Sequence, residues 1–289
     1  MKIGLYKLEN YPNIAIEKLR IYHKQRGDIV VDFPSLEKCD VVYASSIFDF
    51  SGKFTVPYNA ICGGTGFDVK SKLSPEVDAI KPHLNIGFTT RGCIRRCPFC
   101  VVPDKEGYIY IDGDLLDLWD GVTKDLTLYD NNILGLPEHF EYICKQAIEY
   151  GLRLDFNQGL DHRLLTPEIV QLMKSISHKE YRFAFDHPSY INTVENAIKL
   201  LQGNGINRCM WYVLVGFNTT FKQDLFRLNY LRDNNQNAYV QRYHKNTSGK
   251  LEYTALARWA NQHHIFQGMT WKQFLNHKDN KRYELLLRD

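Results

Sequence analysis

The sequence predicts an α/β fold in which a partial (β/α)6 barrel follows a small N-terminal α/β lobe. Short β-rich runs alternate with helical patterns between residues 85 and 245. From the second run onward the runs start about 28 residues apart, which is the length of a βαβ unit. Residues 1–80 show a shorter alternation of their own. Alternating strands and helices favour parallel sheets covered by helices.

Composition limits the class of protein. The chain has 289 residues, 44% of them hydrophobic and 24% charged, which is typical of a globular protein. No apolar run is long enough to span a bilayer, and the first residues reach Glu9 without an apolar signal segment. We therefore expect a cytoplasmic protein without a membrane partner. The net charge of +3 is spread along the chain, which favours a small-molecule substrate over a nucleic acid.

Residues 1–80 predict the first lobe. Strand-like runs at residues 1–8 and 28–33 flank a helical pattern at residues 14–27, and two further strand-like runs follow. This pattern resembles a reduced Rossmann-like lobe. The later runs end in Ser45-Ser46 and in the sequence GGTG at residues 63–66, which lacks the spacing of a dinucleotide-binding loop. Residues 71–85 contain two prolines and are predicted to link this lobe to the next one.

The second lobe, residues 81–245, is predicted to be a TIM-like partial barrel. Its strand-like runs lie at residues 85–90, 125–130, 153–159, 181–186, 210–217 and 237–243. Helical patterns lie at residues 137–151, 166–176, 191–205 and 221–234, and the first and third of them end in glycine, a common stop signal. Residues 246–289 form a third segment, in which residues 254–266 and 271–275 are predicted helices that close the barrel or a domain interface.

Every strand-like run from the second onward ends in a polar or flexible residue. These residues are Asp130, Asn157 with Gln158, Asp186, Gly216, and Gln241 with Arg242. In parallel α/β folds, ligands bind at the carboxyl edge of the sheet. Any one of these residues could instead cap the following helix. Their recurrence at all the strand ends favours a shared binding site.

Three of the seven cysteines lie close together. Cys93, Cys97 and Cys100 fall within eight residues, spaced Cys-x-x-x-Cys-x-x-Cys, in a predicted loop between strands. The other cysteines are isolated in or beside apolar runs and are predicted to be buried free thiols: Cys39, Cys62, Cys144 and Cys209. Without a secretion signal, the seven do not predict a disulfide framework.

The triplet predicts an iron–sulfur cluster, because cysteine thiolates hold such clusters. Three thiolates leave one iron of a four-iron cluster without a protein ligand, free to bind a chelating molecule. Zinc is the alternative, but a structural zinc site needs four ligands, and neither His83 nor His139 has the usual ligand spacing. A purely structural triplet remains the other alternative.

The triplet also resembles the signature of a known family. The spacing, Phe99 just before the last cysteine, the preceding TTRG and the following VVP are similar to the motif of the radical S-adenosylmethionine (radical SAM) superfamily. The resemblance covers roughly residues 85–245. It implies a [4Fe-4S] cluster on the three cysteines and S-adenosylmethionine on the open iron. It also implies reductive cleavage to a 5′-deoxyadenosyl radical that takes hydrogen from a substrate, and an electron donor such as flavodoxin or ferredoxin.

The resemblance implies further cofactor contacts by position. Asp130-Asn131-Asn132 stands where the family places a motif for the methionyl amine, although it departs from the commoner Gly-Gly-Glu. The complete set of implied cofactor-binding residues is Phe99, Asp130, Asn131, Asn132, Asn157, Gln158, Asp186, Val215 and Gly216. Asn157, Gln158 and Asp186 would hold the ribose and carboxylate, and the backbone of Val215 and Gly216 would meet the adenine.

Substrate is expected between the lobe and the barrel edge. The candidate substrate-binding residues are Asn13, Ser45, Ser46, Asn157, Gln158, Asp161, Arg163, Gln241, Arg242 and Tyr243. These side chains offer hydrogen-bond donors and acceptors that suit a polar heterocycle or a sugar-like diol, and no catalytic residue is singled out among them.

The motifs narrow the type of enzyme. No Asp-x-His-x-x-Gly motif for cobalamin and no cysteines for a second cluster are present, so we expect a single-cluster enzyme. The whole chain resembles compact clostridial and phage radical enzymes, and the resemblance implies queuine lyase activity. That reaction is a carbon–nitrogen bond cleavage in queuine salvage that releases a preQ1-type 7-deazaguanine base. Two alternatives are a radical SAM enzyme that modifies RNA or a peptide, and a non-catalytic iron–sulfur redox sensor.

Overall fold

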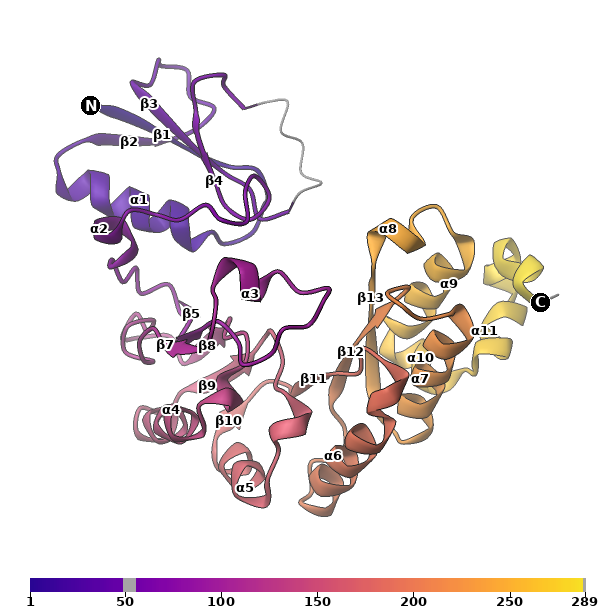
Figure 1. The fold of residues 1–289 in the computed structure, drawn as a ribbon. Helices are drawn as coiled ribbons and strands as arrows, with labels where there is room; N and C mark the ends of the chain where they lie inside the picture. The colour runs from indigo at the N-terminus through magenta and orange to yellow at the C-terminus, as the bar shows by residue number, and fades with distance from the viewer. Residues whose placement is uncertain (49–55, 288–289) are drawn as a thin grey trace.

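A computed structural model describes residues 1–48 and 56–287, and it confirms a mixed α/β chain with parallel sheets (Figure 1). The N-terminal lobe holds one four-stranded parallel sheet in the order β2-β1-β3-β4. Its strands are β1 (Lys2–Lys7), β2 (Ile29–Asp32), β3 (Val41–Ser45) and β4 (Ile61–Gly63). Helix α1 (Ile14–Gln25) covers the sheet, and its first turn is capped by the Asn13 side chain, which accepts a hydrogen bond from the Ile16 N–H.

The lobe has its own small hydrophobic core. The buried apolar residues that form it are Ile3, Leu5, Ile16, Leu19 and Val77. Val77 belongs to α2 (Pro75–Asp78), inside the stretch predicted as linker, and Lys18 on α1 binds Asp78 at 2.8 Å. The first half of that stretch therefore packs on the lobe, because its one apolar helical side chain completes the lobe's core.

The predicted continuous partial barrel is not confirmed, because its strands form two separate sheets. One sheet has the order β10-β9-β8-β5 and the other has the order β11-β12-β13, and all neighbours are parallel. The strands are β5 (Ile86–Gly87), β8 (Asp125–Leu128), β9 (Arg153–Phe156), β10 (Ser177–His178), β11 (Arg182–Ala184), β12 (Met210–Val215) and β13 (Asn237–Arg242). The short strand β10 occupies the edge of β9 that β11 would otherwise pair with. A backbone bond from the Leu160 N–H to the Arg182 carbonyl, 2.7 Å, still bridges the two sheets.

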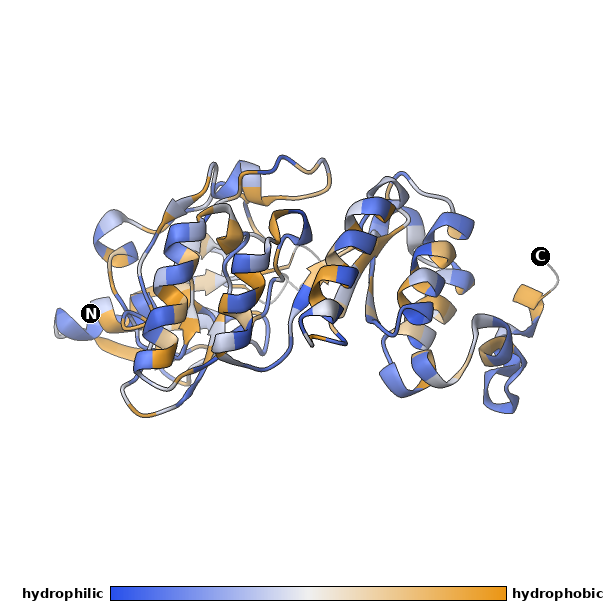
Figure 2. Cartoon of the chain, turned by 90° about the horizontal axis from the view of Figure 1, so that it is seen from below, coloured by the Kyte–Doolittle hydropathy of each residue, from blue (hydrophilic) through white to orange (hydrophobic). Residues whose placement is uncertain are grey.

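The four predicted helices of the second lobe are confirmed. They are α4 (Pro137–Glu149), α5 (Pro167–Ser175), α6 (Ile191–Gly203) and α7 (Phe221–Asp233). The side chains of Thr166 and Thr220 cap α5 and α7. Figure 2 shows apolar strands between helices that turn polar residues outward, as expected of buried parallel sheets.

The predicted C-terminal helices are also confirmed (Figure 1). They are α8 (His244–Thr247), α9 (Leu251–Ala260), α10 (His263–Gly268) and α11 (Trp271–Asn276), followed by the 3-10 segment η5 (Lys278–Leu287). Residues 254–266 are divided between α9 and α10, which lie against β13 of the three-stranded sheet, while α11 packs on α9. The Val240 N–H donates to the Asn261 side chain at 2.6 Å, and Trp259 is fully buried. Within the described residues, no helix has the length and apolar character needed to cross a membrane.

The four isolated thiols divide into two pairs. Cys144 on α4 and Cys209 are fully buried, as predicted. Cys39 is half-buried and Cys62 is exposed, so the prediction of buried thiols is wrong for these two. Cys62 lies on β4, which is at the edge of the lobe's sheet among the described strands and pairs there with β3.

Candidate functional site

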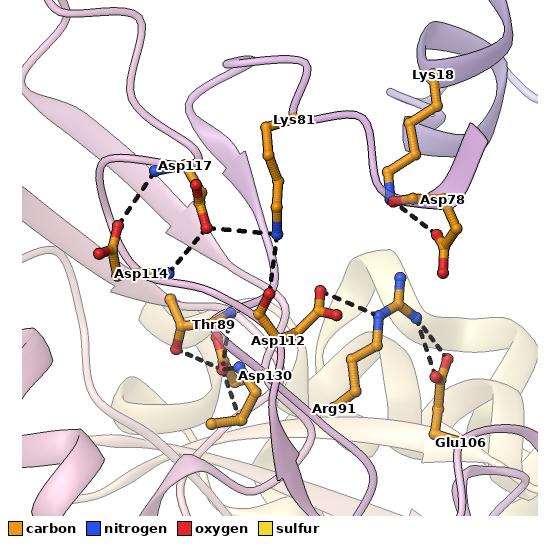
Figure 3. A network of polar contacts seen from close by, with 11 residues as sticks. Lys18, Asp78, Lys81, Thr89, Arg91, Glu106, Asp112, Asp114, Asp117 and Asp130 are labelled. Carbon is orange, nitrogen blue, oxygen red and sulfur yellow. Dashed lines mark hydrogen bonds and ion pairs between the residues drawn. The ribbon is translucent and has the colours of Figure 1, made fainter. Parts of the chain in front are cut away.

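The three clustered cysteines lie in a loop that is fastened at both ends. The loop begins after β6 (Thr90–Arg91), runs through α3 (Val102–Lys105) and ends before β7 (Tyr110–Ile111), which pairs antiparallel with β6. The Cys93 N–H donates to the Gly107 carbonyl at 3.2 Å. Figure 3 shows Arg91 bound to both oxygens of Glu106, at 2.9 and 3.0 Å, and to Asp112 at 3.4 Å. The loop is therefore closed at its base by a charge-assisted ion pair in which Nη1 of Arg91 contacts both oxygens of Glu106.

Gly92 allows the chain to enter this loop. Its φ is +77°, a left-handed conformation that a side chain disfavours. A Cβ there would lie 2.4 Å from the Tyr108 carbonyl oxygen, and backbone atoms cannot move aside cheaply. The turn between Arg91 and Cys93 therefore requires glycine.

All three thiols are free and half-buried. The Cys93 sulfur accepts hydrogen bonds from the Arg95 N–H at 3.3 Å and from the Asn132 amide at 3.4 Å. Burial raises the pKa of Cys97 and of Cys100, and nearby Arg163 partly opposes the shift at Cys97. Among the described residues, no group of His, Cys, Asp and Glu side chains is arranged around a point where a metal ion would sit.

Asp161 connects the loop to the strand ends. It begins the 3-10 turn η3 (His162–Leu164) after β9, and its carboxylate receives Arg95 at 2.9 Å and Arg163 at 2.6 Å. The Asn132 amide, from the end of β8, also donates to it at 3.3 Å. Asp161 was predicted to bind substrate, but its oxygens are already taken by protein donors.

Asp130 and Asn132 leave two buried acceptors open at the end of β8. One oxygen of Asp130 accepts from Thr89 and Thr90, including the two hydroxyls at 2.8 and 2.6 Å, and Figure 3 shows the Thr89 contact. Among the described residues, its second oxygen has no hydrogen-bond partner, and neither does the side-chain oxygen of Asn132. Burial raises the pKa of Asp130, although the hydrogen bonds from the two threonines oppose the shift. Asn131 stands half-buried between them.

Asp186 follows β11 of the other sheet and lies near the same loop. Its carboxylate accepts from the Leu214 N–H at 3.2 Å, and its charge acts on Cys97 and Cys100. Loss of solvent raises the pKa of Asp186, while the Leu214 N–H and the charge of Arg227 oppose the rise. Asn132 after β8, Asp161 after β9 and Asp186 after β11 thus lie near the cysteine loop.

The backbone at the end of β12 is largely engaged inside the protein. The Gly216 N–H donates to Asp224 at 2.9 Å and its carbonyl accepts from Asn246 at 2.8 Å, while the Val215 carbonyl accepts from the Tyr243 N–H at 3.0 Å. Gly216 and Asn246 line a cavity of about 390 Å³, together with Thr219, Gln223, Lys250 and Tyr253. The Thr219 hydroxyl is buried and has no hydrogen-bond partner in the part of the chain that the structure describes.

Aromatic rings join the loop to this region. Phe99 packs edge-on against Phe217 with ring centres 5.4 Å apart, and Phe217 packs against Tyr243 at 4.9 Å. Phe217 and Arg95 were not predicted, although Phe217 is next to Gly216 and Arg95 lies two residues from both Cys93 and Cys97. Asp224 was also missed, because nothing in a helical pattern marks an inward carboxylate.

The remaining predicted residues lie apart from the loop. In the lobe, the Asn13 amide donates to Ser45 at 2.9 Å and the Ser46 hydroxyl to Glu9 at 2.8 Å, so these side chains bind each other. Gln241 and Arg242 are exposed, and Arg242 reaches Thr254 at 3.2 Å.

Asn157 and Gln158 follow β9. The Asn157 carbonyl accepts from the Tyr212 hydroxyl at 2.8 Å, while its side chain makes only a long contact of 3.4 Å with Gln158. These two amides therefore keep most of their hydrogen-bonding capacity.

Comparison with known proteins gives a likeness of fold. No family model and no curated protein matches the chain. Among solved structures, it is similar to a radical S-adenosylmethionine methyltransferase, TsrM, from Kitasatospora setae, which was solved with cobalamin and a [4Fe-4S] cluster bound. The TM-score is 0.60 at 11% sequence identity, over 83% of this chain and 74% of that chain. Residues 81–289 make up less than three quarters of the chain, so the shared fold extends into the N-terminal lobe.

A second match is a D-isomer specific 2-hydroxyacid dehydrogenase from Lactobacillus delbrueckii ssp. bulgaricus in its NAD complex. It has 10% identity over 98% of each chain and a TM-score of 0.25, which is too low to indicate a common fold.

Proposed function

We propose that this chain is a radical SAM enzyme that acts on a small polar molecule. The observation that carries the proposal is the loop of three free thiols, fastened at the carboxyl edge of parallel strands and contacted by Asn132 and Asp161 from two strand ends. Cys93, Cys97 and Cys100 would hold a [4Fe-4S] cluster. When bound and reduced by a flavodoxin- or ferredoxin-type donor, the cluster supplies the electron that cleaves S-adenosylmethionine to a 5′-deoxyadenosyl radical.

The residues around the loop fit this cofactor pair. N–H groups from Arg95 and Asn132 point at the Cys93 sulfur, and such hydrogen bonds stabilise a thiolate and tune a cluster. The unpartnered oxygens of Asp130 and Asn132 match an ammonium group, since a buried acceptor without a donor is costly. They would hold the methionyl amine of S-adenosylmethionine.

The adenosyl part would extend toward the second sheet. Asp186 offers a carboxylate to the ribose hydroxyls, a charge-assisted hydrogen bond. The Gly216 N–H already donates to Asp224, so it is not available to the adenine. The adenine would instead lie in the neighbouring cavity. The unpartnered Thr219 hydroxyl is the open polar group there.

Anaerobic reconstitution tests this proposal. The protein should take up about four irons and form 5′-deoxyadenosine on reduction with S-adenosylmethionine, and replacing any one of the three cysteines with alanine should abolish that product. The matched controls are Cys39, Cys62, Cys144 and Cys209 replaced singly with serine, which should keep full iron. Production of 5′-deoxyadenosine by the triple alanine variant would disprove the proposal.

The finer proposal is queuine lyase, in which a preQ1-type base is released from the cyclopentene diol. The guanine-like edge of that base presents an N–H and an amino group side by side, which pair with a side-chain carbonyl. Asp161 is fully bonded to arginines, so Asn157 and Gln158 are the candidates for this contact. Replacing either with alanine should weaken queuine binding about 10- to 100-fold while leaving iron content unchanged.

Product analysis separates the finer proposal from its alternatives. Reduced enzyme with S-adenosylmethionine and queuine should release the aminomethyl-deazaguanine base. If 5′-deoxyadenosine forms without that base, the radical activity stands and the lyase proposal fails. RNA or peptide modification would then be the next activity to test. A cluster that is redox-active but never cleaves S-adenosylmethionine would indicate a sensor.

A test of cobalamin binding distinguishes this proposal from a methyltransferase activity, since the similar methyltransferase was solved with cobalamin bound. We keep the prediction that this chain does not use it, because it lacks the Asp-x-His-x-x-Gly motif. Titrating hydroxocobalamin into the protein should leave the corrinoid spectrum unchanged. A saturable spectral shift would instead favour a methyltransferase.

A further inference from the structure

One buried carboxylate ties together three parts of the site. The Asp161 side chain is 6% exposed. Its Oδ1 accepts from Arg163 Nε at 2.6 Å and from the Arg163 N–H at 3.2 Å. Its Oδ2 accepts from Arg95 Nε at 2.9 Å, Arg163 Nη2 at 3.0 Å and Asn132 Nδ2 at 3.3 Å. The carboxylate therefore accepts five hydrogen bonds from Arg163, Arg95 and Asn132.

The partners of Asp161 come from different segments. Arg95 lies inside the cysteine loop, between Cys93 and Cys97, and its side chain is one-third exposed. Asn132 follows β8, and the same amide nitrogen that reaches Asp161 also reaches the Cys93 sulfur at 3.4 Å. Arg163 lies two residues after Asp161. Its guanidinium carbon lies 5.3 Å from the centre of the Tyr190 ring, and this stacking fixes the orientation of the arginine side chain.

Electrostatic interactions stabilise the contact between Asp161 and its two arginine partners. Burial alone would raise the pKa of Asp161, but the hydrogen bonds and charges of Arg163 and Arg95 lower it overall, so the carboxylate is ionised at neutral pH. Charge-assisted bonds to guanidinium are about twice as strong as neutral ones. Removing the carboxylate would leave two arginine side chains without their partner beside the loop.

We propose that Asp161 is a positioning residue for the cysteine loop. It holds Arg95, and with it the segment from Cys93 to Cys97, against the ends of β8 and β9. The importance of that loop rests on the proposed function, but the contact itself does not depend on any bound group.

Thiol alkylation of the cluster-free, reduced protein tests this inference. In a Cys39→Ser/Cys62→Ser background, the reaction of Cys93 with iodoacetamide is followed residue by residue by mass spectrometry. Asp161→Ala and Arg95→Gln should each speed alkylation of Cys93 about 10- to 100-fold, because each releases the loop. Asp161→Glu should restore part of the protection. The matched control is Asp125→Asn, which breaks an ion pair with Arg153 at the opposite ends of β8 and β9.

Arg95→Gln also separates position from charge. Removing a cation near a thiol raises its pKa and slows alkylation, whereas releasing the loop speeds it. Faster reaction in Arg95→Gln supports positioning, and slower or unchanged reaction overturns it, even if Asp161→Ala fails to fold. Because no cluster is present, failure of the radical proposal would leave this result intact.

Discussion

At the scale of single residues, burial decides how a titratable group contributes to the pH dependence of stability. His162 is 6% exposed, bonds Thr193 at 3.1 Å and packs on Trp211 with ring centres 5.6 Å apart. Burial lowers the pKa of His162 to about 4, so the imidazole is neutral in the fold. His162 is next to Asp161 in sequence, but its ring packs in the hydrophobic core.

This shift predicts a pH dependence of stability. The unfolded chain protonates His162 near pH 6.5, whereas the folded chain does so only near pH 4. The contribution of this residue is therefore complete above about pH 6.5 and is lost as the pH falls toward 4, by up to roughly 3 kcal/mol. Urea unfolding of His162→Gln across this range should show a shallower slope than the parent. The same replacement of the exposed His264 should leave the slope unchanged, and equal slopes in all three would contradict the assignment.

At the scale of elements, glycine turns and buried ion pairs fix the strand ends. The loop that carries the three thiols is fastened by Gly92 at its entry and by the Arg91–Glu106 pair at its base. On the second sheet, Arg227 of α7 is fully buried and donates to the carbonyls of Phe185 and Leu214 and to Asp224. One arginine thus ties a helix to the ends of β11 and β12.

Gly92→Ala should disturb the loop without unfolding the protein. The new methyl group meets the Tyr108 carbonyl, and the left-handed backbone adds a penalty of about 1–3 kcal/mol. Iron uptake on reconstitution should fall well below that of the parent, while circular dichroism stays the same. Gly107→Ala is the control, since its φ is +80° but, apart from its chain neighbours, no atom of the described residues lies within 4 Å of the added Cβ. Equal iron loss in both variants would show that the contact with Tyr108 is unimportant.

Asp224→Ala should be strongly destabilising. It leaves the buried Arg227 without its charge partner, which costs about 3–5 kcal/mol. Replacing both residues with leucine removes the stranded charge, so the double variant should be more stable than Asp224→Ala. Chemical denaturation measures both. A double variant less stable than the single one would mean that the bonds to Phe185 and Leu214 outweigh the charge.

At the scale of the whole molecule, the N-terminal lobe has a hydrophobic core that is separate from the core of the second lobe and the C-terminal helices. The lobe's core is small, and no residue of it belongs to the large core of the second lobe and C-terminal helices. Figure 1 shows the lobe connected to the rest through the chain around α2 and β5. A lobe with so little buried apolar area is expected to open first.

Two core variants test this order. Ile3→Ala in β1 and Leu126→Ala in β8 each empty a fully buried site and should cost about 2–5 kcal/mol in their own unit. By hydrogen exchange, Ile3→Ala should lower the protection of β1 and β3 alone, while Leu126→Ala should lower that of β8 and β9. If either variant lowers protection everywhere, the two units unfold together.

Local pattern was enough for the elements and for the position of the cysteine loop. The β-rich runs and helical periodicity located all four strands of the lobe and the helices α4 to α7, because such patterns reflect burial of one face. The spacing of Cys93, Cys97 and Cys100 identified the loop, since ligands supplied by one short segment are visible in one short segment. Of the polar residues predicted at the strand ends, Asp186 lies near the cysteine loop, whereas Asn157 and Gln158 contact each other and Tyr212.

Only the tertiary structure decided how the sheets join and which polar groups are free. The division between β10 and β11 follows from which strand reaches the edge of β9, and no local pattern encodes that choice. Asp161 looked like an open acceptor, but Arg95, 66 residues away in sequence, occupies it. Likewise, the Gly216 N–H donates to Asp224 on α7. The sequence of that helix does not show which of its faces points inward. A hydrogen-bonding group is available to a ligand only if no distant partner reaches it first, and that depends on packing across the whole fold.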